Sequence, residues 1–161
     1  VVRRLLEELD RPAVVDADAL HDLEPFSRSA PTVLTPHEGE LAHLLGVQSS
    51  WVAAHRIEAV KRAAETFGCV CLLKGADTLV ATPGEDGVLV VALGTPALAT
   101  AGSGDVLTGI VAAFLAKKLD ARTAAAAAAA AQQLASRMIP QAGAVASDVI
   151  GALPLVLDAP V

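Results

Sequence analysis

Aromatic side chains are scarce in this sequence, whose 161 residues include three phenylalanines, one tryptophan and no tyrosine. Proteins that bind single-stranded nucleic acid stack the bases on aromatic rings, and those that bind duplexes present a basic surface. Here 18 Asp and Glu residues outnumber 12 Lys and Arg residues, which gives a formal charge of −6. We therefore expect no nucleic acid partner.

Cysteine is equally rare. The two cysteines, Cys69 and Cys71, lie two residues apart in an apolar run that predicts a strand. Side chains at this spacing in a strand point to the same face and cannot easily form a disulfide with each other. We interpret them as small core residues rather than as a redox or metal-binding pair.

Long apolar runs are also absent. Charged residues between Lys117 and Arg122 interrupt the most apolar region before it reaches the roughly 20 residues that a membrane-spanning helix needs. The first residues lack the basic end, apolar run and cleavage site of a secretory signal. We therefore expect no membrane partner and a cytoplasmic location.

The chain begins at Val1 without methionine, and we expect it to be a piece of a longer protein.

Apolar residues are abundant. They make up 53% of the sequence, charged residues make up 19%, and the mean hydropathy is +0.52. This composition excludes a disordered chain, and the length fits one domain, spanning residues 1–161, with a substantial core. Because so large an apolar fraction is hard to bury in one small domain, we also expect a homo-oligomer.

The apolar pattern predicts alternating strands and helices. Short apolar runs without alternating polar residues predict strands buried on both faces, and a Pro-Gly turn predicts a hairpin. Helical spacing predicts the remaining elements. We expect strands at 13–16, 32–34 and 70–73, and a hairpin over 78–81 and 88–91. We expect helices at 1–9, at 41–45, from 49 or 50 to 67, at 105–115, and from about 120 through the eight alanines at 124–131. A short last turn near 147 and an irregular tail after Pro154 complete the expected elements. This order predicts an α/β fold with a largely parallel sheet.

Polar side chains follow three of these strands, where open α/β sheets bind their ligands. Asp16 and Asp18 follow the first strand and either orient a ligand or cap a turn. His37 and Glu40 follow the second; a third metal ligand is missing, which favours a capped helix start over a metal site. Lys74 follows the third, and a lone lysine there is usually a solvated strand end.

The most informative segment is 101–107, Ala-Gly-Ser-Gly-Asp-Val-Leu. Glycines allow close approach of the backbone to an anion, and a helix that begins near Gly104 directs free N–H groups and its positive dipole end there. Asp105 either stabilises the first helical turn or acts as a general base beside the bound anion. The segment is not a P-loop, and Leu107 occupies the third glycine's place in the dinucleotide fingerprint.

Four segments in this order resemble one protein family. They are Val-Val-Asp-Ala-Asp-Ala-Leu at 14–20, Leu-Thr-Pro-His-Glu-Gly-Glu at 34–40, Leu-Lys-Gly-Ala-Asp-Thr at 73–78, and Gly-Thr-Pro at 94–96 with Ala-Gly-Ser-Gly-Asp-Val-Leu-Thr-Gly at 101–109. They resemble the ADP- or ATP-dependent NAD(P)H-hydrate dehydratases, the YjeF C-terminal domain of the ribokinase-like fold. The resemblance implies a layered α/β/α architecture. It also implies an N-terminal truncation, because the family domain begins before its Asp-Ala-Asp motif.

The resemblance implies a repair enzyme that restores NADH or NADPH from the hydrates NADHX and NADPHX, with ADP or ATP as phosphoryl donor and Mg²⁺. By this analogy the anion hole is Ala101, Gly102, Ser103 and Gly104, and Asp105 contacts the substrate hydroxyl and takes its proton. The nucleotide would be bound by Lys74, Gly75, Ala76, Asp77, Thr78 and Gly104. His37 would contact the hydrated dinucleotide, and Glu40 would hold magnesium through water.

Two alternatives remain open. A ribokinase-like kinase of a vitamin precursor would share the anion hole and would need phosphoryl transfer alone. A chain that binds nucleotide, or assembles with itself, without catalysing a reaction would also fit. The sequence departs from the family pattern at 132–137, where Gln-Gln-Leu-Ala-Ser-Arg stands in place of His-Gly-x-Ala-Gly-Asp.

Overall fold

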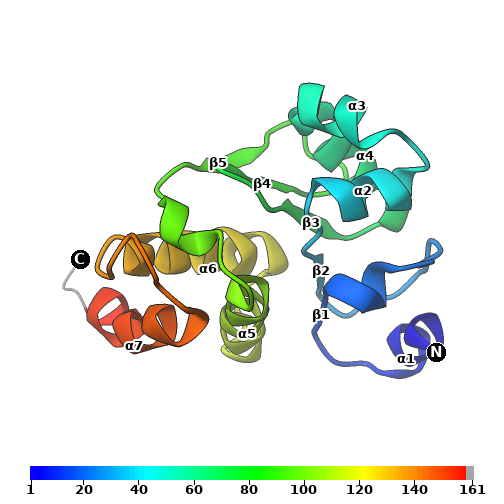
Figure 1. The fold of residues 1–161 in the computed structure, drawn as a ribbon. Helices are drawn as coiled ribbons and strands as arrows, with labels where there is room; N and C mark the ends of the chain where they lie inside the picture. The colour runs from blue at the N-terminus through cyan, green and yellow to red at the C-terminus, as the bar shows by residue number, and fades with distance from the viewer. Residues whose placement is uncertain (159–161) are drawn as a thin grey trace.

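A five-stranded sheet lies between two groups of helices in the computed structural model, which describes residues 1–158 (Figure 1). The strand order is β1-β2-β3-β4-β5. The first three strands are parallel, and the predicted hairpin adds two antiparallel strands, so the sheet is mixed. The strands are β1 (Ala13–Val15), β2 (Thr32–Leu34), β3 (Val70–Leu73), β4 (Thr78–Ala81) and β5 (Leu89–Val91).

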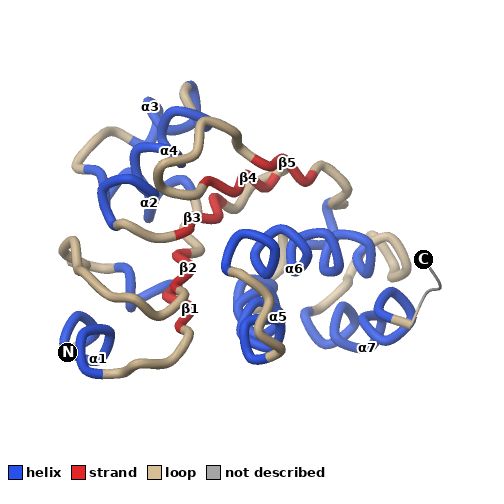
Figure 2. The backbone as a smooth tube through the Cα atoms, turned by 180° about the vertical axis from the view of Figure 1, so that it is seen from behind, coloured by secondary structure: helices blue, strands red, loops and turns tan. Residues whose placement is uncertain are grey.

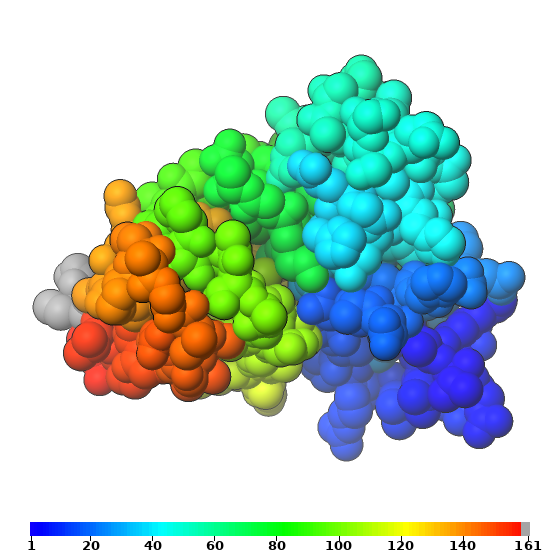
Figure 3. All heavy atoms as spheres, viewed as in Figure 1, coloured from blue at the N-terminus to red at the C-terminus, as the bar shows by residue number. Residues whose placement is uncertain are grey.

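Helices cover both faces of the sheet (Figure 2). One face carries α1 (Val2–Glu8), the 3-10 helix η1 (Ala17–Leu20), α2 (Glu38–Leu45), α3 (Ser49–Ala54) and α4 (Arg56–Phe67). The other carries α5 (Ser103–Ala116) and α6 (Ala121–Ser136), against which α7 (Ala146–Leu157) packs; the short η2 (Pro96–Leu98) precedes α5. The N-terminal and C-terminal helices therefore lie on opposite sides of the molecule (Figure 3).

Successive side chains along each strand point to opposite faces of the sheet, and this explains the two layers of helices. Leu34 of β2 belongs to the core beneath the N-terminal helices, whereas its neighbour Val33 belongs to the core beneath α5 and α6. Cys71 and Leu72 divide in the same way, and all four side chains are fully buried. Both faces of the central strands are thus covered, as their uninterrupted apolar runs predict.

The two cysteines are confirmed as core residues. Cys69 and Cys71 are free, buried and on the same face of the sheet. Burial disfavours the charged thiolate, so it raises the pKa of Cys69 to about 12 and raises that of Cys71 further.

Two helix predictions were wrong. The helix expected from 49 or 50 to 67 is broken at His55, whose φ of −130° and ψ of 44° separate α3 from α4. Ile57, an apolar residue in the first turn of α4, is exposed. The irregular tail expected after Pro154 is helical over residues 155–157, and residues 159–161 lie outside the described part of the chain. Pro154 lies near the end of α7, where it removes one backbone hydrogen bond, while Val149 and Ala152 are anchored in an apolar cluster with Ala135.

The alanine run forms the centre of α6, which contacts β2, β3, β4 and β5 as well as α5 and α7. The carboxylate of Asp120 caps its first turn by accepting a hydrogen bond of 2.9 Å from the backbone N–H of Thr123. None of the helices within residues 1–158 combines the length and the apolar character needed to cross a membrane.

Candidate active site

A cleft of about 980 Å³ lies where the carboxyl ends of β2 and β3 meet the start of α5. The main-chain N–H of Lys74 donates a hydrogen bond of 2.9 Å to the carbonyl of Pro36 and so aligns these two strand ends. The cleft is lined by His37, Glu38, Gly39, Ser49, Lys74, Gly75, Ala76, Thr78, Gly94, Thr95, Pro96, Leu98, Ala99, Ser103, Gly104, Leu107, Gln132 and Gln133. This is the edge of the sheet at which the sequence predicts a ligand site.

Lys74 is the cation of this site. Its Nζ lies 2.7 Å from Oδ1 of Asp16 and 3.7 Å from Oε2 of Glu40. The other Asp16 oxygen accepts a hydrogen bond of 2.9 Å from the hydroxyl of Thr108. Burial raises the pKa of the Asp16 carboxyl, but the hydrogen bond and charge of Lys74, with the hydroxyls of Thr108 and Thr35, outweigh burial and leave this pKa below its ordinary value. Asp16 is therefore ionised and holds the lysine in place.

The start of α5 faces the same point. Gly102 takes a left-handed conformation, with φ of 84°, and the helix begins at Ser103. No side chain within residues 1–158 caps this end. The N–H of Ser103 donates to the carbonyl of Thr100 (3.3 Å), which leaves the N–H groups of Gly104 and Asp105 in the first turn to bind an anion. A Cβ at Gly104 would lie 3.5 Å from both Nζ of Lys74 and Oδ2 of Asp16. The helix dipole and the lysine charge thus meet beside Gly104.

The start of α2 forms another wall of the cleft. Nδ1 of His37 accepts hydrogen bonds from the N–H groups of Gly39 (3.0 Å) and Glu40 (3.2 Å), and Glu40 accepts from the N–H of His37 (2.7 Å). Because Nδ1 is an acceptor here, the neutral ring carries its proton on Nε2. Nε2, on the exposed edge of the His37 ring, is therefore a hydrogen-bond donor, and it lies 3.4 Å from Oε1 of Glu40. The predicted capped helix start is confirmed in this geometry.

The turn between β3 and β4 is held by two long side chains. Arg56 of α4 pairs with Glu38 and donates to the carbonyl of Asp77 (2.8 Å), and it covers Gly75 so closely that a Cβ there would lie 2.8 Å from its Nη1. Buried Gln133 donates to the hydroxyl of Thr78 (3.0 Å) and accepts from the N–H of Leu93 (2.7 Å).

The structure brings most of the predicted site residues together. His37, Lys74, Gly75, Ala76, Thr78, Ser103 and Gly104 line the cleft. Glu40 lies beside Lys74 without lining the cleft. Ala101, Gly102, Asp77 and Asp105 lie outside its lining among the described residues, and the side chain of Asp105 is exposed in the first turn of α5.

Sequence reasoning missed several side chains that shape the site. Gln132 lines the cleft and donates a hydrogen bond of 2.6 Å to the carbonyl of Ser103, and Gln133, Arg56 and Thr108 hold the elements described above. The two glutamines carry a signal, because they are the first polar residues after the alanine run. Thr108 lies within the family motif at 101–109, but its residue type does not show that it contacts Asp16. Arg56 carries no signal, because it resembles an ordinary helix-surface residue.

The chain is similar in sequence and in fold to known proteins. The chain is 43% identical to the bifunctional NAD(P)H-hydrate repair enzyme Nnr of Moorella thermoacetica over 166 aligned residues, which cover 98% of this chain and 31% of that protein. It superposes on the ADP/ATP-dependent NAD(P)H-hydrate dehydratase of Bacillus subtilis, co-crystallised with ATP/Mg²⁺, with a TM-score of 0.82 and 32% identity, covering 92% of this chain and 55% of that one.

A ribokinase-like superfamily protein from Enterococcus faecalis shares the fold alone, with a TM-score of 0.76 at 21% identity over 97% of this chain and 56% of that one. The predicted ribokinase-like α/β fold is thus confirmed. The chain spans between about a third and about half of the length of these proteins. The family model Carb_kinase, described as NAD(P)H-hydrate dehydratase, matches residues 2–154. The chain belongs to the NAD(P)H-hydrate dehydratase family, as its motifs predict.

Proposed function

We propose that this chain acts in the nucleotide-dependent dehydration that returns NADHX and NADPHX to NADH and NADPH. One observation carries the proposal: the uncapped start of α5, the Lys74 ammonium and the glycine-containing turn after β3 converge on one cleft. Such a convergence of N–H groups, a cation and a helix dipole suits a phosphate group. Family membership supplies the substrate class.

The chemistry explains why a nucleotide is needed. Hydroxide is a poor leaving group, whereas phosphate is a good one. The hydroxyl oxygen of the hydrate attacks the terminal phosphorus of ADP or ATP, the bond from that phosphorus to the bridging oxygen breaks, and AMP or ADP departs. The phosphate then leaves the ring carbon with its electron pair, and loss of a proton from the ring restores the double bond. The hydrate thus loses the elements of one water molecule, and the same water is consumed in converting ADP or ATP to AMP or ADP and phosphate.

Ala101, Gly102, Ser103 and Gly104 would hold the transferring phosphoryl group with backbone N–H groups. The N–H of Gly104 at the uncapped start of α5 supports this role, and Gly104 adds no side chain that would fill the space beside Lys74. The N–H of Ser103 would exchange its hydrogen bond to the carbonyl of Thr100 for one to the phosphoryl group. The protein donors are fixed before the substrate arrives, which is how such a site stabilises developing negative charge.

Asp105 would take the proton of the substrate hydroxyl. Its position one residue after Gly104 and its exposure to solvent support this role, because a substrate can reach the carboxylate beside the anion site. His37 would donate from Nε2 to the hydrated dinucleotide, since its Nδ1 is already committed to the helix cap.

The turn of Lys74, Gly75, Ala76, Asp77 and Thr78, together with Gly104, would bind the nucleotide. Arg56 and Gln133 fix this turn from either side, so its backbone is rigid before the nucleotide binds. Lys74 would neutralise phosphate charge once a ligand competes with Asp16 for it.

Magnesium fits the residues beside Lys74. Asp16 and Glu40 place two carboxylates around a single ammonium group, so the local charge is negative and a bound polyphosphate needs a further cation. Both Asp16 oxygens and the helix-capping oxygen of Glu40 already have protein partners, which favours contact with Mg²⁺ through its water shell. Glu40 would hold the ion in this way, and the ion would neutralise phosphate charge.

Three further proposals concern the whole protein. Residues 1–161 would be one domain, the C-terminal portion of the family domain, located in the cytoplasm. The chain would also self-associate, because Leu5 on α1, Leu9 directly after it, and Ile150 and Leu155 on α7 expose apolar side chains. Light scattering of concentrated protein tests the last proposal, and a monomer would contradict it.

The deciding experiment mixes NADHX or NADPHX with this protein, Mg²⁺ and either ADP or ATP, and follows the reduced-nicotinamide absorbance. Recovery of absorbance that depends on one nucleotide is the expected result and identifies the donor. The Bacillus subtilis enzyme run in parallel checks the reagents. A stable phosphate ester in place of NADH would instead indicate a small-molecule kinase. Nucleotide binding without turnover would indicate a chain that binds but does not catalyse.

A further inference from the structure

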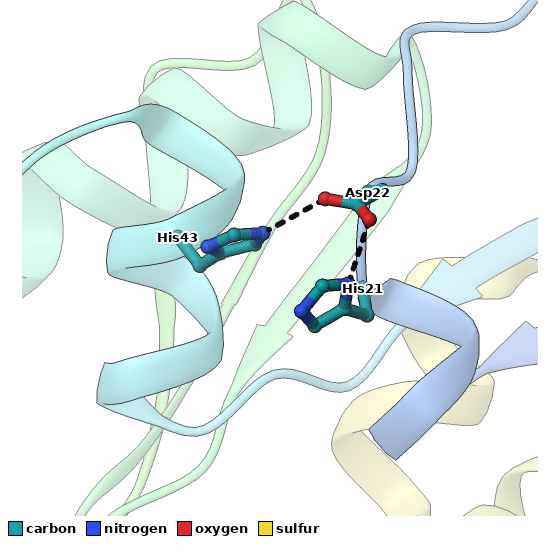
Figure 4. Close-up of side chains that lie close together, drawn as sticks. All are labelled: His21, Asp22 and His43. Carbon is teal, nitrogen blue, oxygen red and sulfur yellow. Dashed lines mark hydrogen bonds and ion pairs between the residues drawn. The ribbon is translucent and has the colours of Figure 1, made fainter.

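A second group of polar side chains lies outside the cleft. His21 and Asp22 follow η1, and His43 lies on α2, and Figure 4 shows both rings directed toward the carboxylate between them. Oδ2 of Asp22 lies 2.9 Å from Nδ1 of His21, and Oδ1 lies 3.3 Å from Nε2 of His43. The two ring centroids are 4.7 Å apart.

These distances suit a shared metal ion. One donor atom from each of the three side chains lies within 4.8 Å of the other two. In a tetrahedral site with bonds of about 2.1 Å, neighbouring donor atoms are about 3.4 Å apart. Small side-chain rotations would therefore bring all three atoms onto one ion. We propose that His21, Asp22 and His43 form a binding site for a first-row transition metal ion such as Zn²⁺.

The donor set separates this site from the magnesium proposed beside Lys74. Two imidazole nitrogens and one carboxylate suit Zn²⁺, Ni²⁺ or Cu²⁺, whereas Mg²⁺ prefers oxygen ligands alone. Each oxygen of the Asp22 carboxylate faces one of the two rings, so all three side chains can contribute a ligand atom to one ion.

The site also has room for a fourth ligand. His21 and His43 line a pocket of about 250 Å³ together with Asp18, Glu40 and His37. A water molecule or a ligand from solution can complete a tetrahedral shell there. Because His37 also lines the large cleft, an ion would join the segment after η1 to the helix that presents His37. The structure therefore places the metal site beside the proposed substrate contact.

The test is titration of metal-free protein with Zn²⁺ by calorimetry, in the absence of nucleotide and hydrate. We expect one ion per chain, with excess Mg²⁺ unable to displace it. His21→Ala and His43→Ala should each weaken binding by at least about tenfold, since each removes one of three protein ligands. His55→Ala is the matched control, because His55 is exposed and instead stacks on Trp51; it should bind Zn²⁺ like the unmodified protein.

A second measurement needs no variant. In ¹⁵N NMR spectra of the unmodified protein, added Zn²⁺ should shift the imidazole signals of His21 and His43 and leave those of His55 unchanged. Absence of binding, undiminished binding by His43→Ala, or equal effects on His55 would each overturn the proposal. None of these readouts uses turnover, so a failure of the proposed dehydratase activity leaves the outcome unaffected.

Discussion

Nζ of Lys74 lies 2.7 Å from Oδ1 of Asp16, although 58 residues separate them in the sequence. The pair joins the carboxyl end of β1 to that of β3, and Thr108 fixes the second Asp16 oxygen from α5. One ionised carboxylate thus ties the ends of β1 and β3 to α5 and orients the lysine of the candidate anion site.

Asp16→Asn should destabilise the protein in a pH-dependent way. The pKa of Asp16 is lowered on folding, so its contribution is fully present above the unfolded-state value of about 3.9 and is lost as pH falls through the folded-state pKa. We expect a loss of about 2 kcal/mol at neutral pH, which shrinks below about pH 4. Urea denaturation of both proteins across this range measures it. A difference that does not change with pH would contradict the ion pair.

Gly104→Ala should weaken nucleotide binding without destabilising the fold. The added methyl would lie 3.5 Å from both Lys74 and Asp16, an ordinary contact, but it would fill the space proposed for phosphate. We expect at least about a tenfold increase in Kd, equivalent to about 1.4 kcal/mol. Gly109→Ala on the same helix is the control, because a Cβ there meets no atom of residues 1–158 within 4 Å. Equal binding by the two variants would argue against an anion site at Gly104.

Asp105→Asn tests the proposed base. The amide keeps the size of the side chain but cannot accept a proton, so turnover should fall by about a hundredfold or more while nucleotide affinity is retained. Turnover of the hydrate and calorimetric nucleotide binding measure the two effects. Asp86→Asn, in the exposed turn before β5, should change neither. Normal turnover by Asp105→Asn would remove Asp105 from the mechanism.

Gln133→Ala should lower the free energy of unfolding by about 2 to 3 kcal/mol. The substitution removes the partners of the Thr78 hydroxyl and the Leu93 N–H, and it leaves a cavity at a site that is 3% exposed. Gln48→Ala, at an exposed position before α3, should change stability by no more than about 0.5 kcal/mol. Similar losses in the two variants would mean that these buried hydrogen bonds contribute little.

The thiols should be unreactive in the folded protein. Burial raises the pKa of Cys69 to about 12 and that of Cys71 further, so neither forms the reactive thiolate near neutral pH. A chromogenic disulfide reagent should label both thiols rapidly in denaturant and slowly without it. Rapid labelling of native protein would show that β3 opens readily.

The sequence predicts individual helices and strands better than it predicts the tertiary contacts between them. The strand at 70–73 is predicted because its apolar run needs two covered faces, and the observed strand has both. The break at His55 is not predicted, because 49–67 keeps helical spacing without glycine or proline. Pro154 has the opposite effect: a strong local breaker is tolerated because tertiary contacts hold the helix around it.

The same limit applies to the site. Glycines and the helix start predict the candidate anion site because both signals lie within seven residues. The partnership of Asp16 with Lys74, and that of His43 with Asp22, depend on segments 58 and 21 residues apart. A local sequence pattern cannot predict contacts between segments so far apart in the chain. These two pairs are therefore recognised only in the three-dimensional structure, where the sheet and α2 bring them together.

The eight-alanine run of α6 has one last consequence. A helix face made of identical methyl groups offers neighbouring helices nearly the same surface after a shift of one turn, so it fixes distance but not position along the axis. Position must come from the ends. Asp120 caps one end, and at the other Gln132 and Gln133 bind Ser103, Thr78 and Leu93. The glutamines that border the cleft thus also fix the position of α6 along its axis. A shift of α6 along this axis would therefore alter the candidate active site directly.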